Sequence, residues 1–405
     1  MSIRKRSWNA PSGEIKEAWI VDFRDQKGKR TIKTFARKRE AENYAITVKV
    51  QLRDGTYVAD SDSTTVAEAG AMWINAGDND GLERSTRDQR RQHVDLHIVP
   101  YLGHVRLSQL TAPMVRGFED DLRRDDRSPA MVRKVRTSLG AILTNAVELG
   151  LATRNPVRDL RSRRRRGVEQ RAERRAKGRL KVGVDFPTPD EIKAIIKAAS
   201  DRWRPFLMTA ILTGLRASEL RGLRWSDVDL AKSEIHVRQR ADKRRRIGPP
   251  KSEAGERTVP IPRGLVAALR EWKAACPKGP LGLVFPNKLG HVIFYGDLID
   301  AALLPTMIAA GVSVIAKDAG GHVLLGPNGK PIRNAKYTGL HSLRHFYASW
   351  CINRKIDGGL ELPAKVVQER LGHSTIGMTL DTYGHLFPPG DDRDELTTAE
   401  TALLS

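Results

Sequence analysis

One segment of this sequence cannot belong to a packed core, and it therefore constrains the whole fold. Residues 161–181, RSRRRRGVEQRAERRAKGRLK, hold nine arginines and two lysines against two glutamates. Val168 and Leu180 are the only large apolar side chains among them. Such a segment buries too little apolar surface to offset the entropy of ordering it. The pattern predicts an interdomain linker at 161–183, with separately folded parts on either side.

The length and the charge of the chain agree with this division. At 405 residues the chain exceeds what one hydrophobic core usually supports, which indicates two or three domains. Its 70 lysines and arginines outnumber its 48 aspartates and glutamates, giving a formal net charge of +22. This excess favours a polyanionic partner, because cations that contact phosphates release condensed counterions. Basic residues occur throughout the chain, which favours a long DNA footprint over a ribosomal protein or a basic tail.

The charge of the linker would let it follow the phosphate backbone of DNA that passes between two domains. Arg163, Arg164 and Arg165 are its candidate DNA contacts. A nuclear-localisation signal is the alternative that the composition alone allows.

Apolar periodicity indicates a small mixed module before the first helical region. Within residues 1–58, alternating patterns predict strands at 18–23 and 30–35, and an amphipathic pattern predicts a helix at 36–52. Residues 64–160 then show four helical segments separated by short Gly, Pro or Ser breaks, which predicts a compact helical bundle.

The largest predicted domain follows the linker, at 184–389. It is mostly helical, with strand-like pieces at 234–238 and 257–261. A glycine-rich insert at 316–332 predicts a hairpin, to which we assign no role, and residues 390–405 form a tail. The predicted fold class is thus mainly α with small β-sheets (α+β).

The cysteine content and the N-terminus indicate a reducing, cytoplasmic setting. Cys276 and Cys351 lie in apolar surroundings and are expected to be core thiols, too few for a disulfide framework or a zinc cluster. The N-terminus lacks the apolar run of a signal peptide, and no apolar stretch is long enough for a membrane span. We therefore expect a protein of a reducing, DNA-containing cytoplasm, with no membrane partner.

Four motifs in the second half of the chain carry the chemistry. They are LTGLRASEL at 212–220, KSEAGERTVPIP at 251–262, HSLRH at 341–345 and LGHSTIGMTLDTYGH at 371–385. No metal-ligand pattern or phosphate-binding glycine loop accompanies them, and we expect no cofactor. Handling a phosphate without a metal ion calls for guanidinium groups, which stay charged and can bind two oxygens at once. Arg216 and Arg344 are the candidates.

Taken one at a time, these residues have ordinary explanations. His341 and Arg344 are three apart on one predicted helix and project from the same face, and a histidine that titrates near neutrality suits proton transfer. Arg216 with Glu219, however, could be a common helical ion pair. A lone tyrosine in a helix, such as Tyr383, is usually a packing residue.

Together and in this order, the motifs resemble those of the tyrosine recombinases, the phage integrase family. The resemblance covers all three folded parts and is strongest over 205–385. It implies that Tyr383 is a nucleophile that cuts DNA through a 3′-phosphotyrosyl intermediate, without metal or ATP. The other catalytic positions that it implies are Arg216, Lys251, His341, Arg344 and His373, with Glu219 as a supporting carboxylate.

Some assignments within these motifs have competitors. The resemblance places Lys251 on a hairpin as the acid that protonates the leaving 5′ oxygen, whereas Lys243 is a nearby alternative. Lys243 and the following Arg244 are also candidate DNA contacts. The H-x-x-R pattern selects His341 and leaves His345 as a packing or supporting residue.

The resemblance also implies roles for the other domains and for partners. Residues 1–58 resemble a module that binds arm-type DNA sites, although a dimerisation or capping module is an alternative. Residues 64–160 resemble a core-binding domain, in which Arg90 and Arg91 contact phosphates or simply face solvent. Four protomers would assemble on two double-stranded attachment sites, with the 390–405 tail docking on a neighbour. A directionality factor and a host DNA-bending protein are further expected partners.

These expectations describe the integrase of a prophage or integrative element, and the resemblance therefore implies a bacterial cytoplasm and a place close to the nucleoid. Two other classes of function stay open. A type IB topoisomerase would share the nucleophile and the arginines but would relax supercoils with little site specificity. A non-enzymatic DNA-binding regulator would account for the charge but not for the catalytic set.

Overall fold

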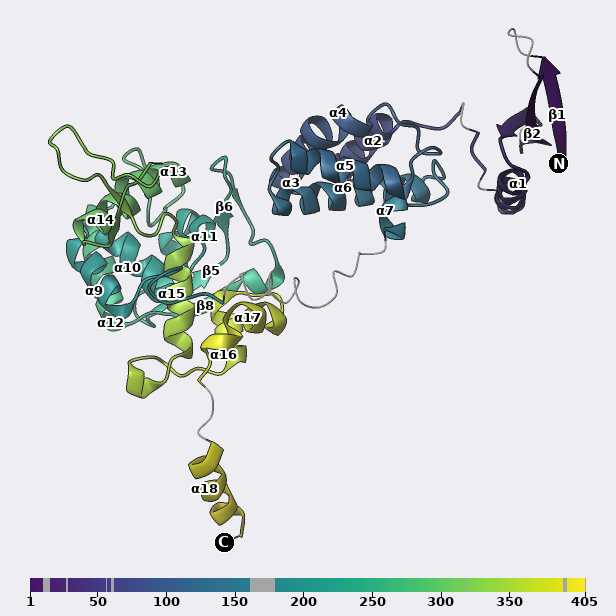
Figure 1. Ribbon diagram of the computed structural model, residues 1–405. Helices are drawn as coiled ribbons and strands as arrows, with labels where there is room; N and C mark the ends of the chain where they lie inside the picture. The colour runs from purple at the N-terminus through teal and green to yellow at the C-terminus, as the bar shows by residue number, and fades with distance from the viewer. Residues whose placement is uncertain are drawn as a thin grey trace. The chain divides into compact units, whose positions relative to one another are not determined.

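The computed structural model describes residues 1–9, 15–26, 28–55, 57–59, 62–160, 179–318, 320–388 and 392–404. The chain forms two compact units, Met1–Gly167 and Val168–Ser405 (Figure 1). Most of the predicted linker, including Arg163, Arg164 and Arg165, lies outside the described residues. Among the described residues, no helix is both long enough and apolar enough to cross a membrane.

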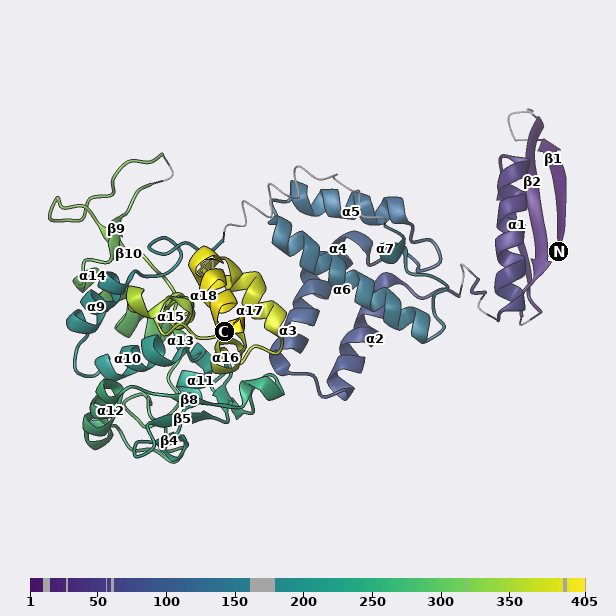
Figure 2. The same cartoon turned by 90° about the horizontal axis from the view of Figure 1, so that it is seen from below.

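The N-terminal module is a three-stranded antiparallel sheet with one helix. Its strands, in sheet order, are β1 (Ser2–Asn9), β2 (Ile15–Arg24) and β3 (Arg30–Phe35). Helix α1 (Lys38–Arg53) lies along the sheet (Figure 2), and its Ala41, Ala45 and Val48 pack on Val21 and Phe23 of β2. The sequence did not indicate β1, because every residue of this edge strand is exposed and it therefore lacks a buried alternating face.

A helical bundle follows in the first unit, and its helices surround one apolar core. Val66, Ala69 and Trp73 of the first helix are buried there, and Thr65 caps that helix in a capping box with Glu68. The helices are α2 (Val66–Asn79), α3 (Arg84–His93), α4 (Val99–Leu102), α5 (Ala112–Arg124), α6 (Pro129–Glu148) and α7 (Pro156–Asp159).

The second unit is mostly helical. Its first helix begins with a capping box between Thr188 and Glu191. The helices are α9 (Pro189–Ala198), α10 (Arg204–Thr213), α11 (Ala217–Gly222), α12 (Arg263–Ala275), α13 (Tyr295–Leu298), α14 (Leu304–Ala309), α15 (His341–Ile352), α16 (Ala364–Leu371), α17 (Ile376–Tyr383) and α18 (Asp392–Leu404).

Three small antiparallel sheets complete the described part of this unit. The largest has the order β4 (Val228–Asp229), β5 (Glu234–Val237), β8 (Arg257–Pro260), and the others pair β6 (Arg240–Ala241) with β7 (Ile247–Gly248) and β9 (Ser313–Ile315) with β10 (Arg333–Ala335). The predicted hairpin of the insert is confirmed, because β9 and β10 on either side of it pair in antiparallel fashion. The chain between these two strands extends away from α9 and α14 (Figure 2). The predicted fold class, mainly α with small sheets, is confirmed as well.

Burial within the bundle leads to a test of its core. Leu139 of α6 is fully buried, so we expect Leu139→Ala to lower the free energy of unfolding by about 2–5 kcal/mol, through lost burial and the cavity that remains. Urea denaturation of the full chain measures this change. Leu149, which follows α6 and is 57% exposed, is the control: Leu149→Ala should change stability by no more than about 0.5 kcal/mol. Equal losses in both variants would contradict this core.

Candidate active site

The predicted catalytic residues stand at the ends of helices that pack on one another. Arg216 is the residue before α11, His341 and Arg344 lie in the first turn of α15, His373 follows α16, and Tyr383 ends α17. Helix α15 packs against α10 and α16, and α16 packs against α17 and β8. Sequence positions up to 167 residues apart, from 216 to 383, therefore meet in one region.

A buried carboxylate, Glu219, lies at the centre of this region. Its side chain is 2% exposed and accepts hydrogen bonds from Nη1 and the backbone N–H of Arg216, each at 2.8 Å. Arg257 donates two more, from Nη1 at 3.2 Å and Nη2 at 2.9 Å. Burial alone would raise the pKa of Glu219, but the charges of Arg257 and Arg216 outweigh burial and lower it. Glu219 therefore stays ionised.

Arg257 belongs to the cluster, although the sequence did not single it out. It lies at the start of β8 with a side chain only 6% exposed, and its Nε donates to the carbonyl of Arg370 at 2.8 Å. The position carried a weak signal: an arginine within the KSEAGERTVPIP motif, where the strand alternation alone does not decide between solvent and interior.

Arg344 is held by two backbone carbonyls. Its Nη1 donates to Gly214 and its Nη2 to Leu371, both at 2.6 Å, while Nη2 of Arg216 donates to the neighbouring Gly372 at 2.8 Å. Because Leu371 and Gly372 are adjacent, the two guanidiniums lie side by side. Burial and the charge of Arg216 lower the pKa of Arg344 to about 9, which leaves it charged at neutral pH.

Two of these carbonyls belong to Gly214 and Gly372, and the third, of Leu371, lies beside Gly372. A side chain fits at neither glycine. Gly214 and Gly372 have left-handed backbone conformations, with φ of +60° and +64°, and each ends a helix. A Cβ on Gly214 would lie 2.4 Å from the ring of Tyr347, and one on Gly372 would lie 2.9 Å from the carbonyl oxygen of Ala254. The tight turns thus place helix carbonyls against the arginines.

His373 and Tyr383 lie next to each other in the same region. Their rings are parallel within 5° with centroids 6.3 Å apart. His373 Nδ1 lies 2.9 Å from Oγ1 of Thr379, and burial followed by the charge of Arg344 lowers the pKa of His373 to about 4. Tyr383 is 2% exposed, and burial raises its pKa to about 12.

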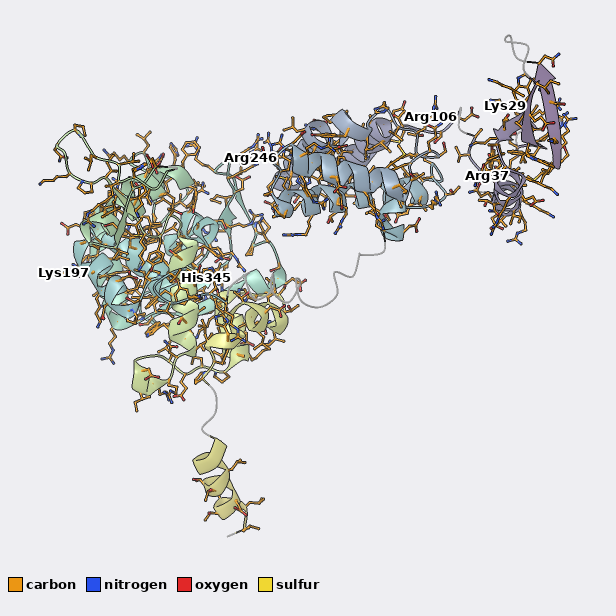
Figure 3. The ribbon with its side chains drawn as sticks, in the orientation of Figure 1. Lys29, Arg37, Arg106, Lys197, Arg246 and His345 are labelled. Atoms are coloured by element: carbon orange, nitrogen blue, oxygen red, sulfur yellow. The ribbon has the colours of Figure 1, made fainter. Side chains whose placement is uncertain are left out.

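The hydroxyl of Tyr383 has a partner that the motif pattern did not predict. Nδ1 of His345 lies 2.8 Å from the Tyr383 oxygen, and the two rings are 5.6 Å apart. His345 lies among the tightly packed side chains of the second unit (Figure 3). One helical turn earlier, His341 contacts His345 edge to face with ring centroids 4.5 Å apart, and loss of hydration followed by the charge of Arg344 lowers the pKa of His341. The sequence expectation that His345 is a packing or supporting residue thus gains a specific contact.

Lys251 lies on an exposed loop between β7 and β8, not in a strand. The loop folds back on itself, since a Cβ on Gly255 would lie 2.5 Å from Cβ of Pro250. Its later part reaches the cluster, where Ala254 abuts the turn at Gly372 and Arg257 donates to the carbonyl of Gly255 at 2.9 Å. The loop that carries Lys251 is therefore anchored beside the arginines.

The hairpin of β6 and β7 carries the competing lysine at its tip. Lys243 and Arg244 are exposed there, in a tight turn in which the Asp242 carboxylate accepts the backbone N–H groups of Arg244 and Arg246, each at 2.8 Å. The tip of this hairpin is therefore basic, and it is a different segment from the loop that carries Lys251.

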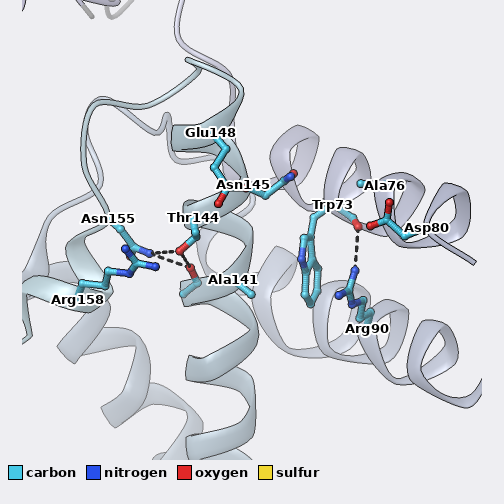
Figure 4. A pocket seen from close by; sticks show the side chains of 11 residues that line it. Trp73, Ala76, Asp80, Arg90, Ala141, Thr144, Asn145, Glu148, Asn155 and Arg158 are labelled. Atoms are coloured by element: carbon cyan, nitrogen blue, oxygen red, sulfur yellow. Dashed lines mark hydrogen bonds between the residues drawn. The ribbon is translucent and has the colours of Figure 1, made fainter. Parts of the chain in front are cut away.

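In the helical bundle, Arg90 and Arg91 are engaged within the protein. The guanidinium of Arg90 lies 4.2 Å from the centre of the Trp73 ring and donates to the Trp73 carbonyl at 3.4 Å, inside a shallow pocket of about 480 Å³ (Figure 4). Nη2 of Arg91 lies 3.9 Å from the carboxylate of Asp78. These contacts favour a packing role for Arg90 over phosphate binding.

Known proteins share both parts of this architecture. Residues 186–388 match the phage integrase family, and residues 66–163 match the phage integrase central domain. The ICEBs1 integrase of Bacillus subtilis strain 168 is 26% identical over 305 residues, covering 73% of this chain and 72% of that protein. A tyrosine recombinase XerC-like protein of Caldanaerobacter subterraneus subsp. tengcongensis is 26% identical over 304 residues, covering 70% of this chain and 69% of that protein.

Solved structures with the same fold include two integrases. The Tn1549 transposon integrase in complex with transposon right end DNA has a TM-score of 0.60 at 18% identity, covering 84% of this chain and 100% of that one. A lambda integrase dimer bound to a COC′ core site has a TM-score of 0.56 at 17% identity, covering 95% and 97%. Fold and sequence together define an enzyme that cuts and rejoins DNA strands. The chain belongs to the phage integrase family, that is, to the tyrosine recombinases.

The buried carboxylate provides a test of the cluster. Glu219→Gln removes the negative charge that Arg216 and Arg257 share, and we expect it to lower the free energy of unfolding by about 3–5 kcal/mol at pH 7. Because the folded pKa of Glu219 lies below its ordinary value of 4.5, this contribution is present above that pH and is lost on acidification through the folded pKa. The difference between wild type and variant should therefore stay constant at neutral pH and shrink only below about pH 4.5.

Denaturation at a series of pH values measures this difference. The control is Asp190→Asn, because the Asp190 side chain is 90% exposed and its pair with Lys193 contributes little. A loss for Glu219→Gln no larger than that for Asp190→Asn would contradict a structural role for the carboxylate.

Proposed function

We propose that this chain is the integrase of a mobile element and that it cuts and rejoins DNA at attachment sites through Tyr383. The observation that carries the proposal is the position of Tyr383 near Arg344 and Arg216, whose positive charges both lower the pKa of its hydroxyl. Around this nucleophile, Arg216, Arg257 and Arg344 bring three positive charges against the one of Glu219. Such an excess suits an anionic phosphodiester.

In this proposal the arginines hold the scissile phosphate. Arg344 uses two N–H groups on backbone carbonyls, and a guanidinium has five, so donors remain for the non-bridging oxygens. Charge that develops on these oxygens during attack is stabilised by groups that are already fixed in place. His373 binds the same phosphate, and His341 handles protons at its edge.

The strand is then cut by transesterification. The Tyr383 oxygen attacks the phosphorus in line, a 3′-phosphotyrosyl bond forms, and the bond to the 5′ oxygen breaks. Lys251 protonates that leaving oxygen. Because the new ester conserves the energy of the broken one, the reverse attack by a 5′ hydroxyl rejoins the strands without ATP.

For the remaining domains we propose roles by analogy with related integrases. The bundle at 64–160 clamps core DNA, the module at 1–58 binds arm-type sites, and four protomers assemble on two attachment sites. Support comes from relatives of this architecture, including a lambda integrase tetramer bound to a Holliday junction, with a TM-score of 0.52 to this chain. The tail at 390–405 docks on a neighbouring protomer, and a directionality factor and a host DNA-bending protein set the direction of the reaction. Lys243, Arg244 and the linker arginines are proposed DNA contacts.

The first test concerns the nucleophile. Nicked duplexes that tile the DNA flanking the gene trap a cut strand, because the short end diffuses away and cannot be rejoined. Wild type should form a covalent protein–DNA adduct on one duplex, and Tyr383→Phe should form none while binding that duplex equally. Denaturing gel electrophoresis measures the adduct. Binding without an adduct in either protein would contradict the proposal, and relaxation of plasmids that lack the site would favour a topoisomerase.

A second test isolates the acid. Lys251→Ala should slow cleavage of ordinary DNA by about 10²–10⁴-fold, the usual contribution of a general acid. A duplex with sulfur at the bridging 5′ position should restore nearly the wild-type rate, because a thiolate leaves without protonation. Rapid-quench assays give both rates. Lys243→Ala, run in parallel, distinguishes the competing lysine: rescue of that variant instead would move the acid to Lys243.

A further inference from the structure

The contact between His345 and Tyr383 has no part in the reaction described so far. We propose that His345 is a catalytic residue, which takes the proton from the Tyr383 hydroxyl as that oxygen attacks the phosphate. The inference rests on the proposed function, since it requires Tyr383 to be the nucleophile. It assigns the proton of the nucleophile to the residue after the motif arginine and not to His341 or His373.

The geometry favours His345 among the three histidines around the tyrosine. Its Nδ1 lies 2.8 Å from the phenolic oxygen, which is within the range for proton transfer. The Nδ1 of His373 instead lies 2.9 Å from Oγ1 of Thr379, and its ring is stacked parallel to that of Tyr383. His341 contacts the ring of His345 edge to face at 4.5 Å. Among the described side chains, His345 is thus the histidine placed on the reacting oxygen.

The charge states of His345 and Tyr383 follow from their surroundings. Burial, the charges of His341 and Arg344 on its own helix, and Asp185, which acts in the opposite sense, together lower the pKa of His345 to about 4. Burial raises the pKa of Tyr383 to about 12, so both groups are neutral at pH 7. Between two neutral groups the imidazole tautomer sets the direction of the hydrogen bond. The proposal requires the tautomer with its proton on Nε2, in which the phenol donates to the unprotonated Nδ1.

A base in contact with this phenol is needed. With a pKa of about 12, only about one molecule in 10⁵ carries a phenolate at pH 7. Bound DNA would make His345 a better base, because the phosphate adds negative charge beside Arg344, one of the groups that lower its pKa. The proton acceptor is thus weak in the free protein and strengthened by the substrate.

The proposed step is balanced. The Tyr383 oxygen forms a bond to phosphorus, its proton moves to His345 Nδ1, and the 5′ oxygen leaves with a proton from Lys251. On rejoining, the 5′ hydroxyl attacks the same phosphorus and returns its proton to Lys251. The bond from phosphorus to Tyr383 then breaks, and the imidazolium of His345 returns its proton to the phenolate.

The test uses the duplex with bridging sulfur at the mapped cleavage position, on which protonation of the leaving group no longer matters. His345→Asn keeps a hydrogen-bond acceptor near the hydroxyl but cannot take a proton. We expect wild-type cleavage to vary little between pH 6 and 9. We expect the variant to be about 10²–10⁴-fold slower at pH 7, with a rate that rises tenfold per pH unit as hydroxide takes the proton. A variant with the wild-type rate, or slower with the wild-type pH profile, would overturn the proposal.

The matched control is His236→Asn. Nδ1 of His236, on β5, is also within hydrogen-bonding distance of a hydroxyl, 2.9 Å from Oγ1 of Thr258. This contact is within the sheet and does not involve Tyr383. The control variant should cleave like wild type. Thermal melting and binding to the same duplex show whether His345→Asn is folded.

A second measurement needs no variant. In the full chain, nitrogen-15 NMR of histidine should show Nδ1 of His345 unprotonated and Nε2 protonated at pH 7, and protonation of Nδ1 would overturn the assignment. The outcomes separate the two proposals. A wild type without any adduct overturns both. An adduct that Tyr383→Phe abolishes, but that His345→Asn leaves unchanged in rate and pH profile, overturns the role of His345 alone.

Discussion

The pairing of Glu219 with two arginines is the interaction on which the candidate site depends. A buried carboxylate remains an anion only where cations and hydrogen bonds replace its lost hydration. Arg216 supplies them from the start of α11 and Arg257 from β8. Each arginine also donates to a carbonyl near the end of α16, at Gly372 and Arg370. One carboxylate thus ties a helix, a strand and the chain leading to Tyr383 into one unit, and its charge fixes where the arginines stand.

The ends of helices supply the second constraint. Carbonyls at a helix C-terminus carry a partial negative charge and lack partners within the helix, so cations are stabilised there. Arg344 meets this need at both Gly214, after α10, and Leu371, the last residue of α16. The left-handed glycines turn the chain sharply enough for both carbonyls to reach one side chain. The guanidinium is therefore oriented before any phosphate arrives, which is the condition for electrostatic preorganisation.

Sequence patterns predicted the elements with strong periodicity and the residues held in fixed spacing. The helical pattern at 36–52 and the strand-like pieces at 234–238 and 257–261 are local, and the order of motifs revealed the family. Strand β1 escaped because nothing on it is buried. The contacts of Arg257 and His345 escaped for another reason. Arg257 meets Glu219 across 38 residues, and His345 meets Tyr383 across 38 residues as well, so tertiary packing alone creates these pairs.

The charges of the site connect cleavage with the presence of substrate. In the free protein, burial followed by the nearby arginines lowers the pKa of His341 and His373, and burial raises that of Tyr383, so the Tyr383 hydroxyl is neutral. A bound phosphodiester would offset the positive charge that acts on the histidines. The phosphodiester in turn needs the arginines, because a buried anion must be paired with cations. In the proposed reaction, the same cations bind the substrate and, once its charge neutralises them, no longer oppose protonation of the base. Burial of Tyr383, which is 2% exposed, raises its pKa to about 12, whereas the charges of Arg344 and Arg216 act in the opposite direction.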